Sequence, residues 1–242
     1  MAAAVAAMEA RRAAFLKSLS STGSVLRSSP RAARYAAAAA TTSSVLVPVV
    51  DVADDASRSR VAAGHDDVAV VFTKRSSLLR AHRGEVCFPG GKSDEGETME
   101  ETALRETIEE TGLPSSAFTI WARLEPVLRL SKRTGGAVMP IVAELHDRAY
   151  LDRLQPNYDE VESIFSVRLS HLLSSVGFTH FVAPSYSFRL PVFTVRQFTV
   201  HAQAEHAFIP ASYTIYGLSA VVLHQVLAHL EPAYARDAVK FV

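Results

Sequence analysis

The segment that decides the fold is GGKSDEGETMEETALRETIEETGL, residues Gly90–Leu113. Its pattern predicts a glycine turn followed by one short helix. Thr98 and Glu101 have the spacing of a capping box, so we expect the helix to begin at Met99. Gly112 suits the left-handed position that ends a helix. The segment therefore predicts a short, well-delimited helix that holds a glycine loop in place.

Three glutamates of the expected helix, Glu106, Glu109 and Glu110, fall on one narrow face. Their charges repel one another and weaken a helix, whereas Mg²⁺ binds carboxylate oxygens together with substrate phosphates. One interpretation is therefore a metal-ligand set. The other is a solvated acidic face on which Arg105 pairs with Glu101 and Glu109. The adjoining face, which we expect to pack on the core, consists of Ala103, Leu104, Thr107, Ile108 and Thr111.

The whole segment resembles the box motif of the Nudix hydrolase family. Thr107 stands where that family usually has an aliphatic residue, and its methyl group can still face the core. The resemblance implies that the protein is an enzyme that requires a divalent cation, Mg²⁺ or Mn²⁺. Glu106 and Glu110 would be the principal metal ligands, with Glu109 as a further ligand.

The resemblance also implies roles for the residues around those glutamates. In Nudix proteins the first box glutamate, here Glu97, pairs with the box arginine, here Arg105, and fixes the loop against the helix. A carbonyl near Gly90 and Gly91 would complete the metal shell. Glu160 matches a family position and is a candidate for the base that activates water. The alternative for Glu160 is a solvated loop carboxylate.

A second motif, VFTKRSSLLRAHRGEVCFPGG, occupies residues 71–91. It resembles the additional signature of the coenzyme A diphosphatase branch of the Nudix hydrolases. Arg75 and Arg80 offer planar forks to phosphate oxygens, and Lys74 adds positive charge nearby. The alternative is that these arginines hold the loop by pairing with local acids such as Glu85.

Together the two motifs imply hydrolysis of the diphosphate bond of coenzyme A or its derivatives, giving 3′,5′-ADP and (acyl-)4′-phosphopantetheine. Arg75, Arg80, Gly90 and Gly91 would contact this small-molecule substrate. One alternative is a Nudix hydrolase of another nucleoside diphosphate derivative such as ADP-ribose, which would not need the second motif. Another is a non-catalytic Nudix binding module, but such domains usually lose the box glutamates.

The composition is that of an ordinary soluble protein with one sizeable core. Its 242 residues include 25 Lys+Arg and 25 Asp+Glu, so net charge gives no support for a nucleic-acid partner. No apolar run approaches the roughly 20 residues that a membrane span needs. Cys87 is the only cysteine, which excludes an internal disulfide framework.

We expect an N-terminal extension over residues 1–43 and a Nudix domain over residues 44–242. The extension is rich in Ala, Ser and Arg, with Glu9 as its one acidic residue, as in an organelle transit peptide. This predicts a mitochondrial address, with a cytoplasmic one as the alternative. The alternative to a transit peptide is that Val5–Leu19 forms a helix that packs on the domain. The ending Lys240-Phe241-Val242 is not a peroxisomal signal of the Ser-Lys-Leu type.

Short apolar runs predict the strands of the domain. With helices expected on both sides, they indicate an α/β fold, an α/β/α sandwich with a mixed β-sheet. We also expect a hairpin between Phe188–Val195 and Arg196–Val200, and a closing amphipathic helix over Tyr216–Leu230. The expected strands are Val45–Val50, Val68–Thr73, Phe118–Leu124, Val138–Leu145 and Val161–Val167.

Overall fold

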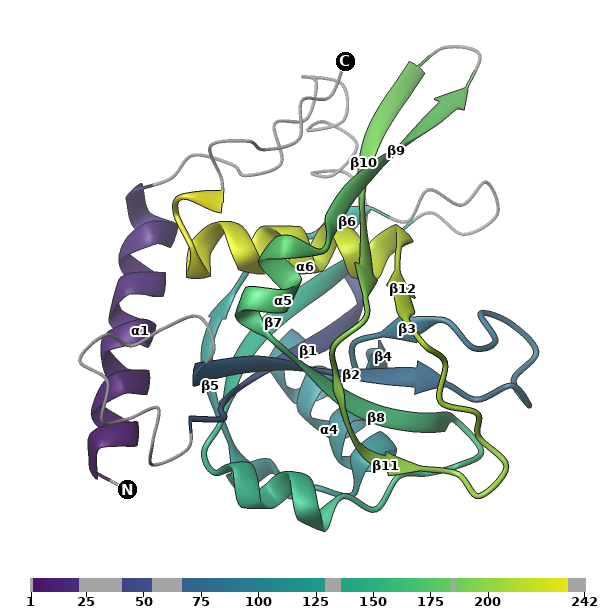
Figure 1. Cartoon of the computed structure of the whole chain (residues 1–242), viewed down its shortest axis with the longest axis horizontal. Coiled ribbons are helices and arrows are strands. Elements are labelled where there is room, and N and C mark those ends of the chain that lie inside the picture. The colour runs from purple at the N-terminus through teal and green to yellow at the C-terminus, as the bar shows by residue number, and fades with distance from the viewer. Residues whose placement is uncertain (1, 22–40, 54–66, 129–135, 184–185, 235–242) are drawn as a thin grey trace.

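The structure is a computed structural model that describes residues 2–21, 41–53, 67–128, 136–183 and 186–234 (Figure 1). The sequence also predicts a turn at Gly135-Gly136, which lies at the edge of these ranges, and an exposed loop over residues 51–67, most of which lies outside them. The helices are α1 Ala2–Ser21, α4 Met99–Thr111, α5 Leu169–Ser174 and α6 Gly217–Leu230, with 3₁₀ turns η2 Ser115–Ala117 and η3 Arg148–Arg153. The strands are β1 Thr41–Asp51, β2 Val68–Arg75, β3 Val86–Cys87, β4 Gly90–Lys92, β5 Phe118–Arg123, β6 Val127–Leu128, β7 Ala137–Leu145, β8 Val161–Arg168, β9 Val176–Ala183, β10 Tyr186–Val195, β11 Thr199–Gln203 and β12 Tyr213–Ile215.

The main sheet has nine strands and is mixed, as the sequence predicts. Its central order is β11-β8-β2-β1-β7-β5, with β3, β4 and β6 paired at the sides of this path. Strand β1 runs parallel to β7, whereas β2 and β4 are antiparallel to β1. The long central strand β1 therefore pairs with three strands, β2, β4 and β7, that come from distant parts of the chain.

Strand β1 changes partner along one edge. Its first half pairs with β4, with Val45 opposite Gly90, and its second half pairs with β2, with Val49 opposite Val70. Pro48 falls between these two stretches, where its missing N–H interrupts no ladder bond. The change of partner brings the glycine turn of β4 and the end of β2 to the same part of the sheet.

Side chains of β1 alternate between two cores on opposite faces of the sheet. Leu46 packs with Ala103 of α4 on one face. Val47 and Val49 lie on the other face, in the large cluster that also contains residues of α1 and α6, such as Leu223. Helices thus cover both faces (Figure 1), which is the α/β/α arrangement expected from the sequence.

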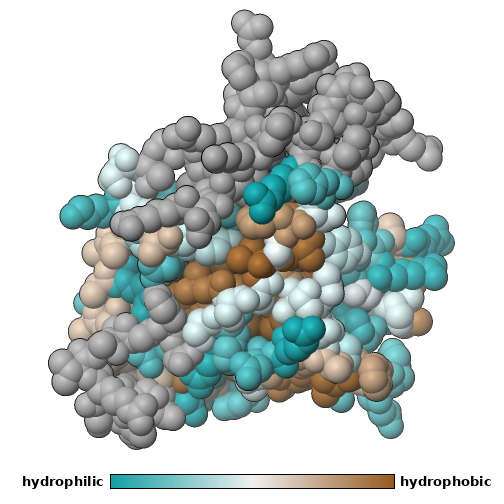
Figure 2. Space-filling model, turned by 45° about the horizontal axis from the view of Figure 1, so that its top comes forward, coloured by the Kyte–Doolittle hydropathy of each residue, from teal (hydrophilic) through white to brown (hydrophobic). Residues whose placement is uncertain are grey.

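Helix α6 is buried more completely than an amphipathic helix. Every residue from Val222 to Leu230 is buried, because α6 contacts α1, β6 and β10. Figure 2 shows hydrophobic residues gathered in the middle of the face turned toward the viewer. The expected helix is present, but it has no exposed polar face over Val222–Leu230, because its polar residues His224, Gln225 and His229 are buried and form hydrogen bonds within the protein.

The expected hairpin between Phe188–Val195 and Arg196–Val200 is wrong. Strand β10 instead pairs with β9, which the sequence analysis did not identify, and with β12 in a separate three-stranded sheet. The chain then crosses to the main sheet, where β11 pairs with β8. The alternation of apolar and polar residues predicts a strand but does not determine which strands pair with it. Here one of the two partners, β9, precedes β10 in the chain.

Helix α1 packs against the end of the domain formed by α6 and β5. Met8 and Phe15 are buried, and the Phe15 ring lies 5.7 Å from the Trp121 ring and 5.6 Å from the His229 ring. Ser18 Oγ is hydrogen-bonded to His229 Nδ1 at 3.1 Å. This is the packed N-terminal helix that the sequence analysis gave as the alternative to a transit peptide. Within the described residues, no helix is long and apolar enough to cross a membrane.

We predict that Phe15→Ala destabilises the whole domain by about 3 kcal/mol, because it leaves a cavity between Trp121 and His229. The matched control is Leu16→Ala, since Leu16 is 39% exposed, and it should cost less than about 1 kcal/mol. Chemical denaturation followed by circular dichroism measures both. Equal, small losses for the two variants would mean that α1 is not part of the cooperative fold.

Candidate active site

Helix α4 has the limits that the sequence predicts. Thr98 is its N-cap, and the reciprocal bonds of a capping box with Glu101 are both present. Gly112 ends the helix with φ 73°, a left-handed conformation that favours glycine. The buried face differs in part from the expected one. Ile108 is exposed, whereas Thr102, which was not assigned to that face, is buried and donates to Glu97 Oε2.

The glycine turn brings backbone directly against a carboxylate of α4. Strand β4 pairs Gly91 with Ser44 of β1, and α4 packs beside this pair. A Cβ atom on Gly91 would lie 2.3 Å from the carboxylate of Glu106, so no larger residue fits without displacing it. At Gly91 a side chain would only require the Glu106 carboxylate to move, whereas at Gly90 a Cβ atom would lie 2.3 Å from the Ser44 carbonyl oxygen, so Gly90 is the position that requires glycine.

Arg105 connects the loop to the helix through several hydrogen bonds. Its Nε donates to Glu97 Oε1 at 2.7 Å, and its Nη2 donates to Glu97 Oε2 at 3.1 Å and to the Lys92 carbonyl at 2.9 Å. The pairing expected of Glu97 and Arg105 is therefore present. The bond from Arg105 lowers the pKa of Glu97 to about 2, so this fork stays charged on both sides at neutral pH.

The three helix carboxylates differ in environment although they share a face. Glu110 is buried, whereas the Glu109 side chain is 57% exposed and contacts Arg105 Nη1 at 3.4 Å. Glu106 lies between these extremes and also contacts Arg105 Nη1, at 3.2 Å. Burial raises the pKa of Glu106. The repulsion expected from the helix pattern is thus reduced by burial of one member and by pairing of the others.

Glu110 carries the least satisfied polar atom of this cluster. Its Oε2 is buried without a hydrogen-bond partner. Burial raises its pKa to about 8, although a hydrogen bond from the Gly90 backbone and the charge of Arg75 act in the opposite direction. A buried carboxylate oxygen with no donor is costly, and a cation beside it would remove that cost. The donor set, carboxylates and backbone carbonyls around Gly90, suits a hard divalent ion.

The loop before β8 closes the C-terminal end of α4. The N–H groups of Gln155 and Asn157 donate to the carbonyls of Thr111 and Glu110, at 2.9 and 3.2 Å. This loop carries Glu160, whose charge raises the pKa of both Glu106 and Glu110. The structure therefore brings Glu160 from a distant part of the chain to the same site.

The two arginines of the second motif lie in different environments. Arg75, at the end of β2, has a buried Nε without a hydrogen-bond partner, and its charge acts on Glu110. Arg80 is exposed on the loop that follows. Neither forms the expected alternative pair with Glu85, which instead contacts His82 Nδ1 at 3.0 Å. Arg75 thus lies beside the buried Glu110, whereas Arg80 is exposed on the loop after β2.

Lys74 does not extend toward the site as free positive charge. It forms an ion pair with Glu162, and both side chains are largely buried. Sequence analysis did not single out Glu162. The only signal was its position two residues after Glu160, on the strand that pairs with β2.

The described residues contain no group of three or more His, Cys, Asp and Glu side chains already arranged to hold a metal ion. Glu109 is the most exposed of the three helix carboxylates and contacts Arg105, whereas the charges of Glu106 and Glu160 both act on the buried Glu110. The ligand assignment made from the sequence therefore stays a prediction, and Glu110 Oε2 is the atom that favours it.

Comparison with known proteins gives the following matches. The family model described as "NUDIX domain" matches residues 58–180. "Nudix hydrolase 3" of Caenorhabditis elegans is 40% identical over 197 residues, which is 81% of this chain and 76% of the relative. "Mitochondrial coenzyme A diphosphatase NUDT8" of Mus musculus is 36% identical over 171 residues, 69% of this chain and 72% of the relative. A solved structure of a C. elegans Ap4A hydrolase binary complex is 20% identical, covers 55% of this chain and 84% of its own, and gives a TM-score of 0.42.

We predict that Glu110→Gln stabilises the protein in the presence of a chelator, and that the gain grows with pH. The pKa of folded Glu110, about 8, lies above the ordinary value of 4.5 for a glutamate. Ionisation therefore costs folding free energy, and the cost rises between these two pH values. At pH 8–9 the variant should melt at least about 2–4 °C higher, the shift that 1 kcal/mol gives in a chain of this size. Near pH 4 the difference should vanish.

The matched control for this measurement is Glu109→Gln, which removes an exposed carboxylate one residue away. It should give no stabilisation that increases with pH. Differential scanning calorimetry of the three proteins across this range decides the matter. Parallel pH profiles for wild type and Glu110→Gln would show that Glu110 does not carry the cost of burial.

Proposed function

The chain belongs to the Nudix hydrolase family, and on this basis we propose that it hydrolyses the diphosphate bond of coenzyme A or a derivative. Water would add to one phosphorus and the bridging P–O bond would break, giving 3′,5′-ADP and (acyl-)4′-phosphopantetheine. The observation that carries the proposal is the position of Arg75 beside Glu110, since it joins the second motif to the box. The 36% identity with a protein named as a coenzyme A diphosphatase supports it.

We propose that Mg²⁺ or Mn²⁺, which Nudix hydrolases generally use, binds at Glu106 and Glu110, with Glu109 as a further ligand. The unpartnered Oε2 of Glu110 and the carboxylate of Glu106 against Gly91 support this assignment. A bound divalent cation would supply positive charge against the diphosphate. A carbonyl of the Gly90-Gly91 turn would complete the ligand set.

The remaining site residues have separable roles in this proposal. Glu97 and Arg105 hold the glycine loop against α4, so that the carboxylates keep their positions. Glu160 accepts the proton of the attacking water, because it is an exposed carboxylate that faces Glu106 and Glu110. Arg75 neutralises the diphosphate, and Gly90 and Gly91 let the substrate approach the backbone.

A second candidate substrate class is another nucleoside diphosphate derivative such as ADP-ribose. It would use the same box and the same carboxylates. The exposed position of Arg80 on the loop after Arg75 favours coenzyme A, because an exposed cation there suits a phosphate remote from the bond that breaks.

We further propose a mitochondrial address for the chain, with a cytoplasmic address as the alternative. The composition of residues 1–43 and the mitochondrial relative from Mus musculus support it. The packing of α1 on the domain would then be a property of the chain that retains this segment.

The proposed function predicts which substrates are cleaved and which residues are needed. The purified protein with Mg²⁺ or Mn²⁺ should release 3′,5′-ADP from coenzyme A faster than it cleaves ADP-ribose, as product analysis by chromatography can establish. Glu106→Gln and Glu110→Gln should each lose at least about 100-fold in kcat without unfolding. A wild-type enzyme that prefers ADP-ribose, or keeps full activity in excess chelator, would refute the proposal.

The two arginines predict different losses on coenzyme A and dephospho-coenzyme A, which lacks the 3′-phosphate. Arg80→Ala should lower kcat/KM for coenzyme A by roughly 10- to 150-fold, the value of a charge-assisted bond, and change dephospho-coenzyme A little. Arg75→Ala should penalise both substrates alike, because Arg75 lies beside Glu110. Equal losses on both substrates for Arg80→Ala would mean that Arg80 does not read the 3′-phosphate.

A further inference from the structure

Exposed apolar side chains are concentrated at one end of the main sheet. Among the residues that the structure describes, eight large hydrophobic side chains are exposed, and three of these belong to helices α1 and α4. A single exposed apolar side chain is ordinary, whereas a group of them around a site indicates a binding surface. The other five lie outside helices and strands and are called the apolar rim below: Leu78, Tyr158, Phe208, Ile209 and Tyr216.

The loops that carry the apolar rim emerge where the candidate active site lies. The loop after β2 and the loop before β8 are joined by the Ser76 N–H, which donates to the Glu160 carbonyl at 2.8 Å. The Leu78 N–H donates to Ser76 Oγ at 3.3 Å, and Tyr158 precedes Glu160 by two residues. Leu78 and Tyr158 therefore lie on the two loops that meet next to Arg75, the last residue of β2.

The loop of residues 204–212, between β11 and β12, belongs to the same end of the sheet. At its start the Ala204 N–H donates to the Glu162 carbonyl of β8 at 2.8 Å. Tyr216, just after β12, lies beside Glu85 of the loop after β2, because burial and this carboxylate together raise the pKa of Tyr216. In Figure 1 the loops that follow β2 and β11 lie on the same side of the sheet. The loop of residues 204–212 is therefore held at both ends by elements that border the site.

These two loops differ in chemistry. The loop of residues 76–85 carries basic residues such as Arg80, whereas the loop of residues 204–212 contains no Lys or Arg. In the second loop Phe208 is 78% exposed and Ile209 is 44% exposed. A thioester of coenzyme A is divided in the same way, with phosphate at the nucleotide end, an apolar chain at the acyl end, and the diphosphate between them. The two arms of a substrate held at its diphosphate thus match the two loops.

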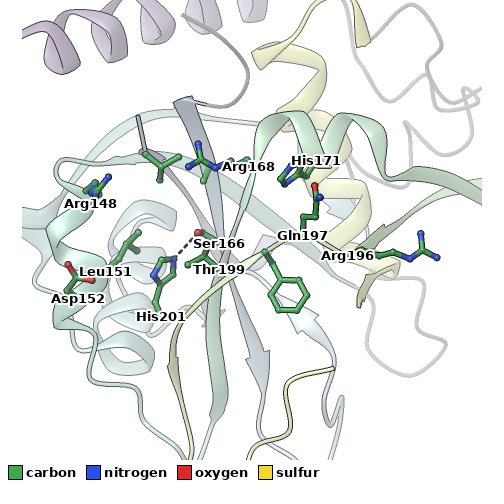
Figure 3. A pocket seen from close by; sticks show the side chains of 13 residues that line it. Arg148, Leu151, Asp152, Ser166, Arg168, His171, Arg196, Gln197, Thr199 and His201 are labelled. Carbon is green, nitrogen blue, oxygen red and sulfur yellow. Dashed lines mark hydrogen bonds between the residues drawn. The ribbon is translucent and has the colours of Figure 1, made fainter. Parts of the chain in front are cut away.

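A cavity of about 570 Å³ is remote from the place where this apolar chain would lie (Figure 3). Ala69 and Arg168 help to line the cavity, and they pair with each other at the opposite end of β2 and β8 from Arg75. Seven residues of strand separate the two ends by about 23 Å. For a substrate whose diphosphate lies beside Arg75, the apolar rim is therefore the nearer surface.

We propose that Phe208 and Ile209 contact the acyl chain of a coenzyme A thioester, so that the enzyme cleaves acyl-coenzyme A in preference to free coenzyme A. The inference rests on the proposed function and names the form of the substrate that fits the site. Free coenzyme A ends in a small thiol and leaves the apolar rim in water, whereas an acyl chain covers it. Each methylene group that is buried in this way is worth about fourfold in binding.

Steady-state hydrolysis by the full chain with Mg²⁺ tests this preference, with free coenzyme A and octanoyl-coenzyme A as substrates. For wild type, kcat/KM should be at least about 10-fold higher for octanoyl-coenzyme A. Phe208→Ala and Ile209→Ala should each lower this ratio at least about fivefold, the value of one to two methylene groups. The change should appear in KM for octanoyl-coenzyme A, because the acyl chain is remote from the bond that breaks. Phe208→Leu keeps an apolar side chain and should keep most of the preference.

Leu16→Ala is the matched control, because Leu16 is an exposed apolar residue of α1 outside the apolar rim, and this variant should keep the wild-type ratio. Equal kcat/KM values of wild type for the two substrates would overturn the inference. So would equal losses on both substrates in Phe208→Ala, which would mean that the loop only supports the site. Cleavage of neither substrate by wild type would refute the proposed function itself, so the two failures are distinguishable.

Discussion

The candidate site depends on one costly feature, the burial of the Glu110 carboxylate. The protein offers it one backbone hydrogen bond from Gly90 and the charge of Arg75, and leaves its Oε2 without a partner. Such a group is tolerated only where the surrounding structure fixes it. Here Gly90 lets the turn lie close to the backbone of β1, where a Cβ atom would be 2.3 Å from the Ser44 carbonyl oxygen, and Arg105 links the loop to the helix by hydrogen bonds. The glycine turn and the hydrogen bonds of Arg105 therefore keep the buried carboxylate of Glu110 in position.

Strand β1 fixes the position of the elements that form the site. It pairs with β4, which carries the glycine turn, with β2, which ends at Arg75, and with β7 on its other side. Its side chains reach both cores, so burial of apolar surface on two faces fixes its position. Residues that are far apart in sequence, such as Ser76 and Glu160, meet because β2 pairs with β8, and the Ser76 N–H donates to the Glu160 carbonyl at 2.8 Å.

Local chemistry determined what the sequence could predict. The limits of α4 follow from Thr98, Glu101 and Gly112, whose bonds are made within one turn of the helix. Ile108 was assigned to the core because a helical wheel does not say where the core lies, and the exposed side of α4 is set by packing of its other face on β1. The pairing partner of β10 and the burial of α6 likewise depend on contacts between distant segments of the chain. The cavity at the end of β8 could not be anticipated, since its lining comes from elements that only the fold brings together.

The cavity at the end of β8, which Ala69 and Arg168 help to line, lies too far from the candidate active site to influence it through charge alone. About 23 Å separates the ends of β2 and β8, and the screening length at physiological ionic strength is about 8 Å. A charge at the cavity therefore adds little potential at Glu110. Any coupling between the two ends would have to pass through a change in structure, and the strands between them are buried on both faces. Packed strands resist such change, so physical reasoning favours independence of the two ends of the sheet.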